Sequence, residues 1–270
     1  MKMPSQRQIR QLQRKIRLFY KKNKRNLPWR KTSNPYNILI SEIMLQQTQV
    51  ERVVFYYHKW LKKWPTIQKL AIASKADVLR QWMGLGYNTR AIHLHKASQK
   101  IIESYHGDII RAMEHYKEIP GIGPYTSGAV QIFSLNKDMV VIDTNIRRIL
   151  IHEFTLKETI DNIDLLKIAQ RCLPKGKSRE WHNALMDYGA TFLTSRKTGI
   201  RPLTKQSTFE GSDRQIRTRI LKQILSSKKP LKFLTIKKFL QDIEEKRLKK
   251  IINGMVKDNL IFNRKKEYLV

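Results

Sequence analysis

The stretch Ile119-Pro120-Gly121-Ile122-Gly123-Pro124-Tyr125-Thr126 decides the fold of this chain. It joins two segments with helical patterns, and its apolar-Pro-Gly-x-Gly order predicts a tight hairpin. Gly121 and Gly123 supply the positive φ and the close approach that the turn needs, and proline suits the first position of a helix. Such a turn exposes backbone N–H groups at a helix N-terminus, where they bind a phosphate without a charged side chain. We therefore expect this hairpin to contact nucleic acid.

The composition indicates the same partner. The chain has 270 residues and a net charge of +32, so we expect it to bind a polyanion. Its apolar stretches are short and its N-terminus lacks a signal-peptide core, which favours a soluble, cytoplasmic, nucleoid-associated protein over one bound to a membrane. We expect a monomer. The single cysteine, Cys172, excludes an intrachain disulfide and any multi-cysteine metal centre.

The hydrophobic pattern divides the chain into two predicted domains. From residue 6 to about 195 apolar residues recur at helical spacing, so we predict a mainly α domain at 1–195. A basic linker at 196–211 precedes a small domain at 212–270, which opens on a capping box of Ser212 and Gln215. Two more helical patterns and a terminal hairpin follow. This order fits a winged helix, and a plain helical cap on the first domain fits it equally well.

Two carboxylic acids are the candidate catalytic groups. Glu42 lies in the middle of an apolar helical pattern that begins at Pro35, where burial should raise its pKa far enough for it to donate a proton at neutral pH. Asp143 follows the hairpin by a short helix. Each also has a structural interpretation: Glu42 as a solvent-facing or ion-paired residue, and Asp143 as the N-cap of the helix that follows it. Their coexistence with the hairpin favours a catalytic interpretation.

Several motifs in this order resemble the MutY adenine DNA glycosylases, a branch of the helix-hairpin-helix glycosylase superfamily. The resemblance covers roughly residues 7–195 and rests on the hairpin together with Leu-Pro-Trp-Arg at 27–30, Ser-Glu-Ile-Met-Leu-Gln-Gln-Thr at 41–48, Gly-Leu-Gly-Tyr at 84–87, Asp143-x-Asn145 and Asn-Ala-Leu-Met-Asp-Tyr-Gly at 183–189. An ordered series is far more specific than any one motif. The resemblance implies the helix-hairpin-helix glycosylase fold. It also implies a reaction, the excision of adenine paired with 8-oxoguanine or guanine in double-stranded DNA.

The resemblance also implies residue roles. Glu42 would protonate the departing adenine, and ionised Asp143 would stabilise the positively charged sugar, as paired carboxyls do in glycoside hydrolysis. The remaining roles fall to three groups: Tyr125 and Asn145 position these two acids; Arg25, Trp29, Arg30 and Asn183 read the adenine; Gln47, Thr48, Leu85 and Tyr87 contact the orphaned base and the opened stack. A tyrosine at 125 cannot form the Schiff base that strand-cutting relatives form with lysine. We therefore expect a monofunctional glycosylase.

The chain departs from the family pattern in two places. Most MutY-like proteins carry a four-cysteine iron–sulfur centre just after the motif at 183–189, and residues 190–197 contain no cysteine, so we predict a variant without the cluster. The hairpin remains a possible site for a structural monovalent cation. The family's C-terminal Nudix-like domain is too large for the residues after Gly211. Its absence leaves the preferred base opposite adenine open.

Two rival functions remain at this point. A thymine glycosylase acting on T·G mismatches belongs to a branch that also has tyrosine after the hairpin. A non-catalytic DNA-binding protein would use the glycosylase-like domain only as a clamp. The retained Glu42 and Asp143 argue against the second rival, since a pure binder gains nothing from carboxylates that face phosphate.

Overall fold

The computed structural model describes residues 3–203, 208–227, 229–265 and 267–270. By their internal contacts the residues form two compact units: 1–42, 113–116 and 123–205 in the first, and 43–112, 117–122 and 206–270 in the second. The predicted domain division at 195 and 211 stays a prediction, and residues 204–207 of the predicted linker lie outside the described residues.

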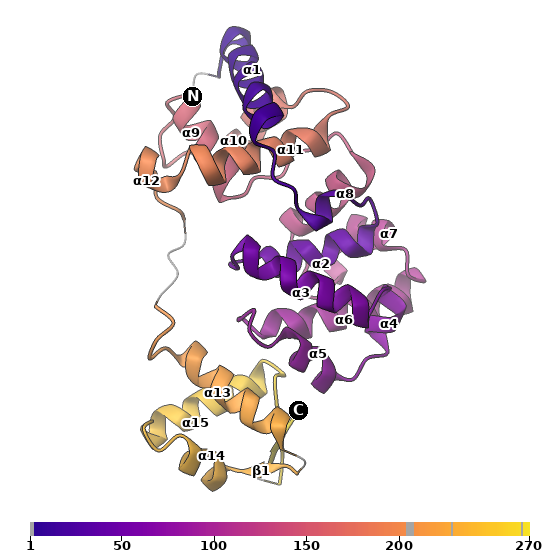
Figure 1. Ribbon diagram of the computed structural model, residues 1–270, viewed down its shortest axis with the longest axis vertical. Coiled ribbons are helices and arrows are strands. Elements are labelled where there is room, and N and C mark those ends of the chain that lie inside the picture. Colours follow the sequence, from indigo (N-terminus) through magenta and orange to yellow (C-terminus); the bar gives the residue numbers. More distant parts are fainter. Residues whose placement is uncertain (1–2, 204–207, 228, 266) are drawn as a thin grey trace. The chain divides into compact units, whose positions relative to one another are not determined.

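The first unit is built from helices. Its elements are α1 (Gln6–Asn23), the short turn η1 (Pro28–Arg30), most of α2 (Pro35–Leu45), α8 (Pro124–Leu135), α9 (Thr144–Glu153), α10 (Asn162–Cys172), α11 (Ser178–Asp187), the π-helical turn η3 (Tyr188–Phe192) and α12 (Ser195–Thr198). Helix α1 is amphipathic and places Ile9, Leu12 and Ile16 in a core shared with α9, α10 and α11. Figure 1 shows these four helices packed together.

The second unit holds the remaining helices and a small sheet. Its elements are the end of α2, α3 (Val50–Lys63), α4 (Ile67–Ala71), α5 (Lys75–Trp82), α6 (Thr89–Tyr105), most of α7 (Ile109–Glu114) and of the turn η2 (Tyr116–Glu118), α13 (Asp213–Ser226), β1 (Leu231–Lys232), α14 (Phe233–Phe239), α15 (Glu245–Lys257), β2 (Phe262–Arg264) and β3 (Glu267–Leu269). Trp60 and Trp82 are fully buried and pack edge to face in its core.

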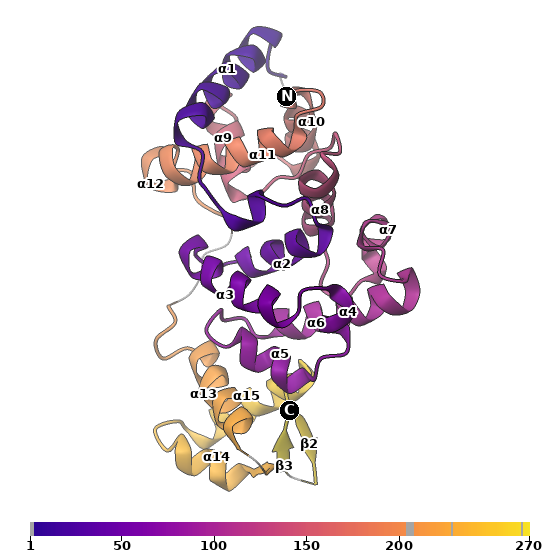
Figure 2. The ribbon, with the colours of Figure 1, turned by 45° about the vertical axis from the view of Figure 1, so that its right-hand side comes forward.

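The C-terminal stretch has the predicted helices and hairpin, and β1 adds a third strand. The strands pair antiparallel in the order β1-β3-β2, with Leu231 opposite Tyr268 and Phe262 opposite Leu269. Figure 2 shows the hairpin strands beside α13 and α15. This element order is winged-helix-like. The predicted capping box forms only in part, because the Ser212 hydroxyl accepts the Gln215 N–H while the Gln215 side chain accepts the N–H of Gly211.

Candidate active site

Glu42 lies on a helix that is buried on all sides. Asn34 begins α2 by accepting the backbone N–H of Tyr36 at 2.9 Å, and the helix then runs through Ile38, Leu39 and Ile40, each at most 1% exposed. Glu42 itself is 8% exposed. Burial raises its pKa to about 8, and the nearby charge of Asp143 adds to the rise while Arg30 opposes it. The predicted upward shift is confirmed, so Glu42 holds a proton at neutral pH.

Asp143 caps helix α9 and accepts hydrogen bonds through both oxygens. Its Oδ1 accepts the backbone N–H of Ile146 at 2.7 Å, and its Oδ2 accepts the Asn145 side-chain amide at 3.0 Å. Burial raises the pKa of Asp143, while these hydrogen bonds and the charge of Arg148 oppose the rise because they favour the ionised form. Asp143 is therefore the N-cap of α9, as the structural interpretation expected, and its catalytic role stays a prediction.

The two acids and Tyr125 share one electrostatic environment in the first unit. The Asp143 charge raises the pKa of Glu42, and after burial the largest contributions to the raised pKa of Tyr125 come from Glu42 and Asp143. Two carboxyls that interact do not both ionise readily, because their negative charges repel, so one of them keeps a proton. The hydrogen bonds donated to Asp143 stabilise its anion, so Glu42 holds the shared proton. Tyr125 stays a neutral phenol that can donate a hydrogen bond.

Arg148 holds the Asn145 side chain that contacts Asp143, a role that the sequence analysis missed. Its guanidinium donates to the Asn145 side-chain oxygen at 2.6 Å and to the backbone carbonyls of Gly189 and Leu193, each at 2.7 Å. The hydrogen bonds from Arg148 to Asn145 and from Asn145 to Asp143 therefore link the Asp143 carboxylate to the π-helical turn η3. The sequence spacing could have indicated this contact, because Asn145 and Arg148 lie three residues apart on one helix face.

We predict that Gly189→Ala will damage catalysis more than folding. A Cβ at Gly189 would come 2.7 Å from Cβ of Asn145 and 3.2 Å from Cδ1 of Ile149, so Asn145 must move and its hydrogen bond to Asp143 must change. Misplacement of a catalytic group by about 1 Å can cost about a hundredfold in rate. Single-turnover excision measures the loss. Gly254→Ala on α15, where an added Cβ meets no atom within 4 Å, is the matched control. Equal rates for the two variants would contradict the positioning role of Asn145.

The predicted base-reading residues gather around an aspartate that the sequence analysis did not select. Asp187 at the end of α11 is fully buried, and it accepts from Arg25 through Nε at 2.5 Å and from Arg30 through both terminal nitrogens at 2.7 and 2.8 Å. Trp29 and Asn183 are also buried. Both arginines are therefore anchored by a paired, hydrogen-bonded carboxylate. Their contact with adenine stays a prediction.

Only one of the two hairpin glycines has the predicted positive φ. Gly121 has φ +74°, and a Cβ there would lie 2.5 Å from the Cβ of His93, so only glycine fits. Gly123 has φ −100° and caps α8 in extended backbone with nothing close to it, so the prediction of positive φ there is wrong. Pro124 opens α8 as predicted. The DNA-binding role of both glycines stays a prediction.

The residues predicted to face the orphaned base come together in the second unit. Arg90 of α6 donates to the carbonyls of Gln46, Leu85 and Gly86 at 2.6, 3.2 and 3.0 Å and to the Thr48 hydroxyl at 3.1 Å. The Thr48 hydroxyl lies 3.4 Å from the Leu85 carbonyl. Arg90 therefore ties the end of α2 to the Gly-Leu-Gly-Tyr loop.

Not all of these side chains face solvent. Gln47 is exposed with φ +55°, and Tyr87 is half-buried with φ +47°. Leu85 is only 4% exposed, so it must leave its packing if it is to enter a base stack. The roles of these residues at the orphaned base stay predictions.

The residues at the expected cluster position do not fit an iron–sulfur centre. Cys172, the one cysteine of the chain, lies in the hydrophobic core, where burial raises the pKa of its thiol to about 12 and disfavours the thiolate that a metal needs. The segment after α11 instead forms η3, where Tyr188 stacks on Phe192 with ring centroids 5.1 Å apart. Within the described ranges no three His, Cys, Asp or Glu side chains are grouped to hold a metal ion.

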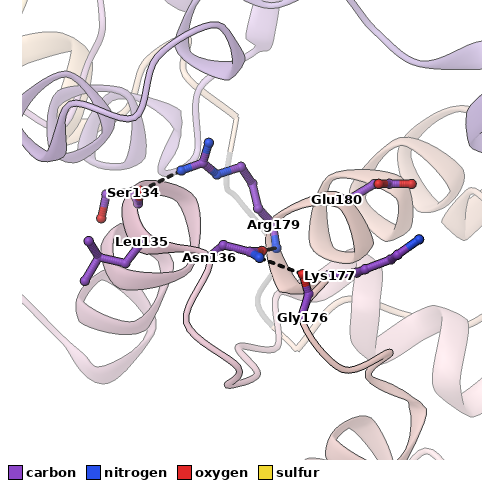
Figure 3. Close-up of a pocket in the computed structure, with 7 residues that line it drawn as sticks. All are labelled: Ser134, Leu135, Asn136, Gly176, Lys177, Arg179 and Glu180. Carbon is purple, nitrogen blue, oxygen red and sulfur yellow. Dashed lines mark hydrogen bonds between the residues drawn. The ribbon is translucent and has the colours of Figure 1, made fainter.

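An open hollow in the first unit lies away from the two acids. It measures about 460 Å³ and lies at the end of α8, lined by Ser134, Leu135, Asn136, Gly176, Lys177, Arg179 and Glu180 (Figure 3). Arg179 donates to the Ser134 carbonyl at 2.6 Å and Asn136 to that of Gly176 at 2.7 Å, so these groups serve to join loop and helix. The predicted site residues are not among those that line it.

Residues 40–175 match the model of the HhH-GPD superfamily base excision DNA repair protein. The chain belongs to this family. It is 33% identical over 222 residues to the human adenine DNA glycosylase, covering 77% of this chain and 40% of the human protein. It is also 33% identical over 234 residues to the adenine DNA glycosylase of Mycolicibacterium smegmatis, covering 79% of this chain and 80% of that one.

Two solved structures with similar folds support this family assignment. A thermostable thymine-DNA glycosylase is similar with a TM-score of 0.67 at 28% identity, over 71% of this chain and 90% of that one. An endonuclease III bound covalently to DNA has a TM-score of 0.64 at 17% identity, over 74% of this chain and 92% of that one, which supports the fold alone. The chain is therefore a DNA glycosylase of base excision repair with the predicted helix-hairpin-helix fold. No helix in the described part of the chain has the length and apolar character needed to traverse a bilayer.

Proposed function

We propose that this glycosylase removes adenine mispaired with 8-oxoguanine or guanine from double-stranded DNA. The observation that carries the proposal is the pair of acids, buried Glu42 and half-buried Asp143, whose environments favour the proton on Glu42 and the charge on Asp143. The likeness to two adenine DNA glycosylases over more than three quarters of the chain supports adenine as the base. The net charge of +32 suits a DNA partner.

The two acids suit the two demands of the reaction. Adenine leaves as a poor anion unless its ring nitrogen is protonated, and protonated Glu42 supplies that proton as the bond between the sugar C1′ and adenine N9 breaks. The sugar becomes an oxocarbenium-like cation, which the Asp143 carboxylate stabilises. Water then attacks C1′, and ionised Glu42 accepts its proton, which restores the starting state. The products are free adenine and an abasic site.

Adenine must leave the base stack before this chemistry can occur. Extrusion costs a few kcal/mol, and contacts to the backbone and to the orphaned base offset that cost. We assign recognition of the extruded base to Trp29, Asn183 and the Arg25–Arg30–Asp187 cluster. An amide at 183 can both donate to and accept from a purine edge.

We expect the enzyme to leave the DNA strand intact. Tyr125 stands where strand-cutting relatives have their Schiff-base lysine, and its raised pKa keeps the phenol neutral. Borohydride should therefore trap no covalent adduct, and nicks should form only after alkali or heat. Trapping of a specific lysine together with rapid nicking would contradict this prediction.

A panel of duplexes tests the proposal. Purified protein should release adenine from A·8-oxoG and A·G duplexes and leave T·G and U·G duplexes unchanged. The similar thymine-DNA glycosylase structure keeps T·G excision as the second candidate function. Release of pyrimidines alone would establish the thymine activity. A wild-type protein that binds every lesion duplex and excises from none would leave only DNA binding.

The same proposal has three further parts. The protein lacks an iron–sulfur cluster, its hairpin binds a monovalent cation, and it is a monomer. Hydrogen bonds from Arg148 to the Gly189 and Leu193 carbonyls fix the segment after α11, where the resemblance would place the cluster. Iron analysis of the purified protein and its mass by light scattering would test the first and third of these.

A further inference from the structure

The C-terminal part of the chain reaches the Gly-Leu-Gly-Tyr loop directly. Arg214, at the start of α13, donates through a terminal nitrogen to the Tyr87 hydroxyl at 2.7 Å. The same guanidinium lies over the Tyr87 ring, 4.9 Å from its centroid. Both residues belong to the second compact unit, although 127 positions separate them in sequence. A hydrogen bond and a cation–π contact to one ring together restrict where that ring can point.

Two further contacts attach the same C-terminal part to α5, the helix before this loop. Arg80 donates to the Leu225 carbonyl at the end of α13 at 3.1 Å. Lys75 places its ammonium 3.7 Å from the centroid of the Phe262 ring on β2, and burial lowers its pKa to about 8. The beginning and end of α13 and the hairpin are therefore all in contact with residues 75–87.

The backbone of this loop is held independently of Arg214. Tyr56 donates its hydroxyl to the Met83 carbonyl at 2.8 Å, and Trp82 donates its indole N–H to the Gly86 carbonyl at 3.1 Å. Arg90 fixes Leu85 and Gly86 and lies 5.7 Å from the Tyr87 ring. The contacts of Arg214 therefore act on the side chain of Tyr87 more than on the path of the loop. Tyr87 has φ +47°, a conformation that is uncommon for a residue other than glycine.

We propose that Arg214 is a positioning residue for Tyr87, and that residues 208–270 thereby take part in recognising the mispair. The inference rests on the proposed function, because it takes a mispaired duplex as the ligand and uses the predicted entry of Tyr87 into the opened base stack. A ring already held in place loses less conformational freedom when it enters a base stack, so the contact strengthens binding where the stack opens. A fully paired duplex, which offers no such opening, gains little from it.

The test compares Arg214→Ala with Arg219→Ala, in each case on the full chain. Arg219 is also on α13, and its charge pairs with Asp242 at 2.8 Å, so Arg219→Ala removes an equal charge without touching the loop. Dissociation constants are measured for an A·8-oxoG duplex and for a fully paired duplex, in a Glu42→Gln background that prevents turnover. We expect Arg214→Ala to weaken mispair binding about five- to tenfold beyond the control, with equal effects of both variants on paired DNA.

Two more variants separate positioning from general structure. Arg214→Lys keeps the charge but loses the planar stacking, so it should recover only part of the mispair affinity. In a Tyr87→Phe background, which lacks the accepting hydroxyl, Arg214→Ala should cost less than in the wild type, because the two residues act through one contact. Full additivity of the two changes would overturn the proposal.

Two other results of the binding comparison would contradict the inference. Equal mispair binding by Arg214→Ala and Arg219→Ala would overturn the inference. Tighter binding by Arg214→Ala would overturn it too, because the contact would then oppose insertion of Tyr87. A wild type that releases no adenine would remove the proposed function and leave this binding comparison valid. The two failures are therefore distinguishable.

Discussion

Glu42→Gln will reduce the single-turnover excision of adenine by about a thousandfold or more and leave DNA affinity within about twofold of the wild type. The buried acid holds a proton at neutral pH because burial and Asp143 raise its pKa to about 8. Glutamine is isosteric and neutral like the protonated acid, so the fold and the site charge are preserved while the proton donor is lost. General acid catalysis accounts for about 10²–10⁴ in rate, and loss of the base that activates water adds to it.

The control for Glu42→Gln is Ser41→Ala on the same helix. Ser41 is buried like Glu42, at 1% against 8% exposed, and its hydroxyl donates to the Ile38 carbonyl at 2.8 Å, within α2. This change perturbs the same buried helix without touching the acid. Excision by Glu42→Gln at a tenth of the wild-type rate or faster would show that another group supplies the proton.

Asp143→Asn will reduce excision by about a hundredfold to a thousandfold with little loss of thermal stability. Asparagine is also a good N-cap and can still accept the Ile146 N–H that Asp143 accepts at 2.7 Å, so α9 keeps its start. The negative charge that we propose stabilises the developing sugar cation is lost. Removal of one preorganised electrostatic partner of a transition state costs about 10²–10³ in rate.

Asp143→Ala separates the two roles of this residue. It should lower excision as far as Asp143→Asn and also lower the melting temperature, because loss of an N-cap costs about 1 kcal/mol. Thermal melting followed by circular dichroism measures the second effect. An Asp143→Asn variant with wild-type excision would restrict Asp143 to its role as a cap.

Much of the fold and the acid pair could be predicted from the sequence for identifiable reasons. An apolar helix with one carboxyl in its middle forces either a shifted pKa or an ion pair, and Glu42 shows the shift. A Pro-Gly-x-Gly-Pro stretch permits few backbone paths, and Gly121 and Pro124 adopt the expected ones. These features are local, so the spacing of neighbouring residues carries them.

The features that the sequence analysis missed are contacts between residues far apart in the chain. Asp187 pairs with Arg25 and Arg30 across more than 150 positions, and within its own motif it looks like an ordinary helical residue. The contact of Arg214 with Tyr87 likewise has no local signature. The error at Gly123 has a different cause, since a glycine at a helix N-cap need not have positive φ.

The pH dependence of single-turnover excision tests most directly whether Glu42 acts as the protonated acid and Asp143 as the ionised one. General acid catalysis requires protonated Glu42, so the rate constant should stay level from about pH 6 to about pH 7.5 and fall above about pH 8, approaching tenfold per unit. The negative charge of the DNA phosphates raises the pKa of a nearby carboxyl, which moves that midpoint upward. The Glu42→Gln variant should show no such fall. A wild-type rate constant that rises through pH 8 would mean that ionised Glu42 drives bond breaking, and would contradict the account.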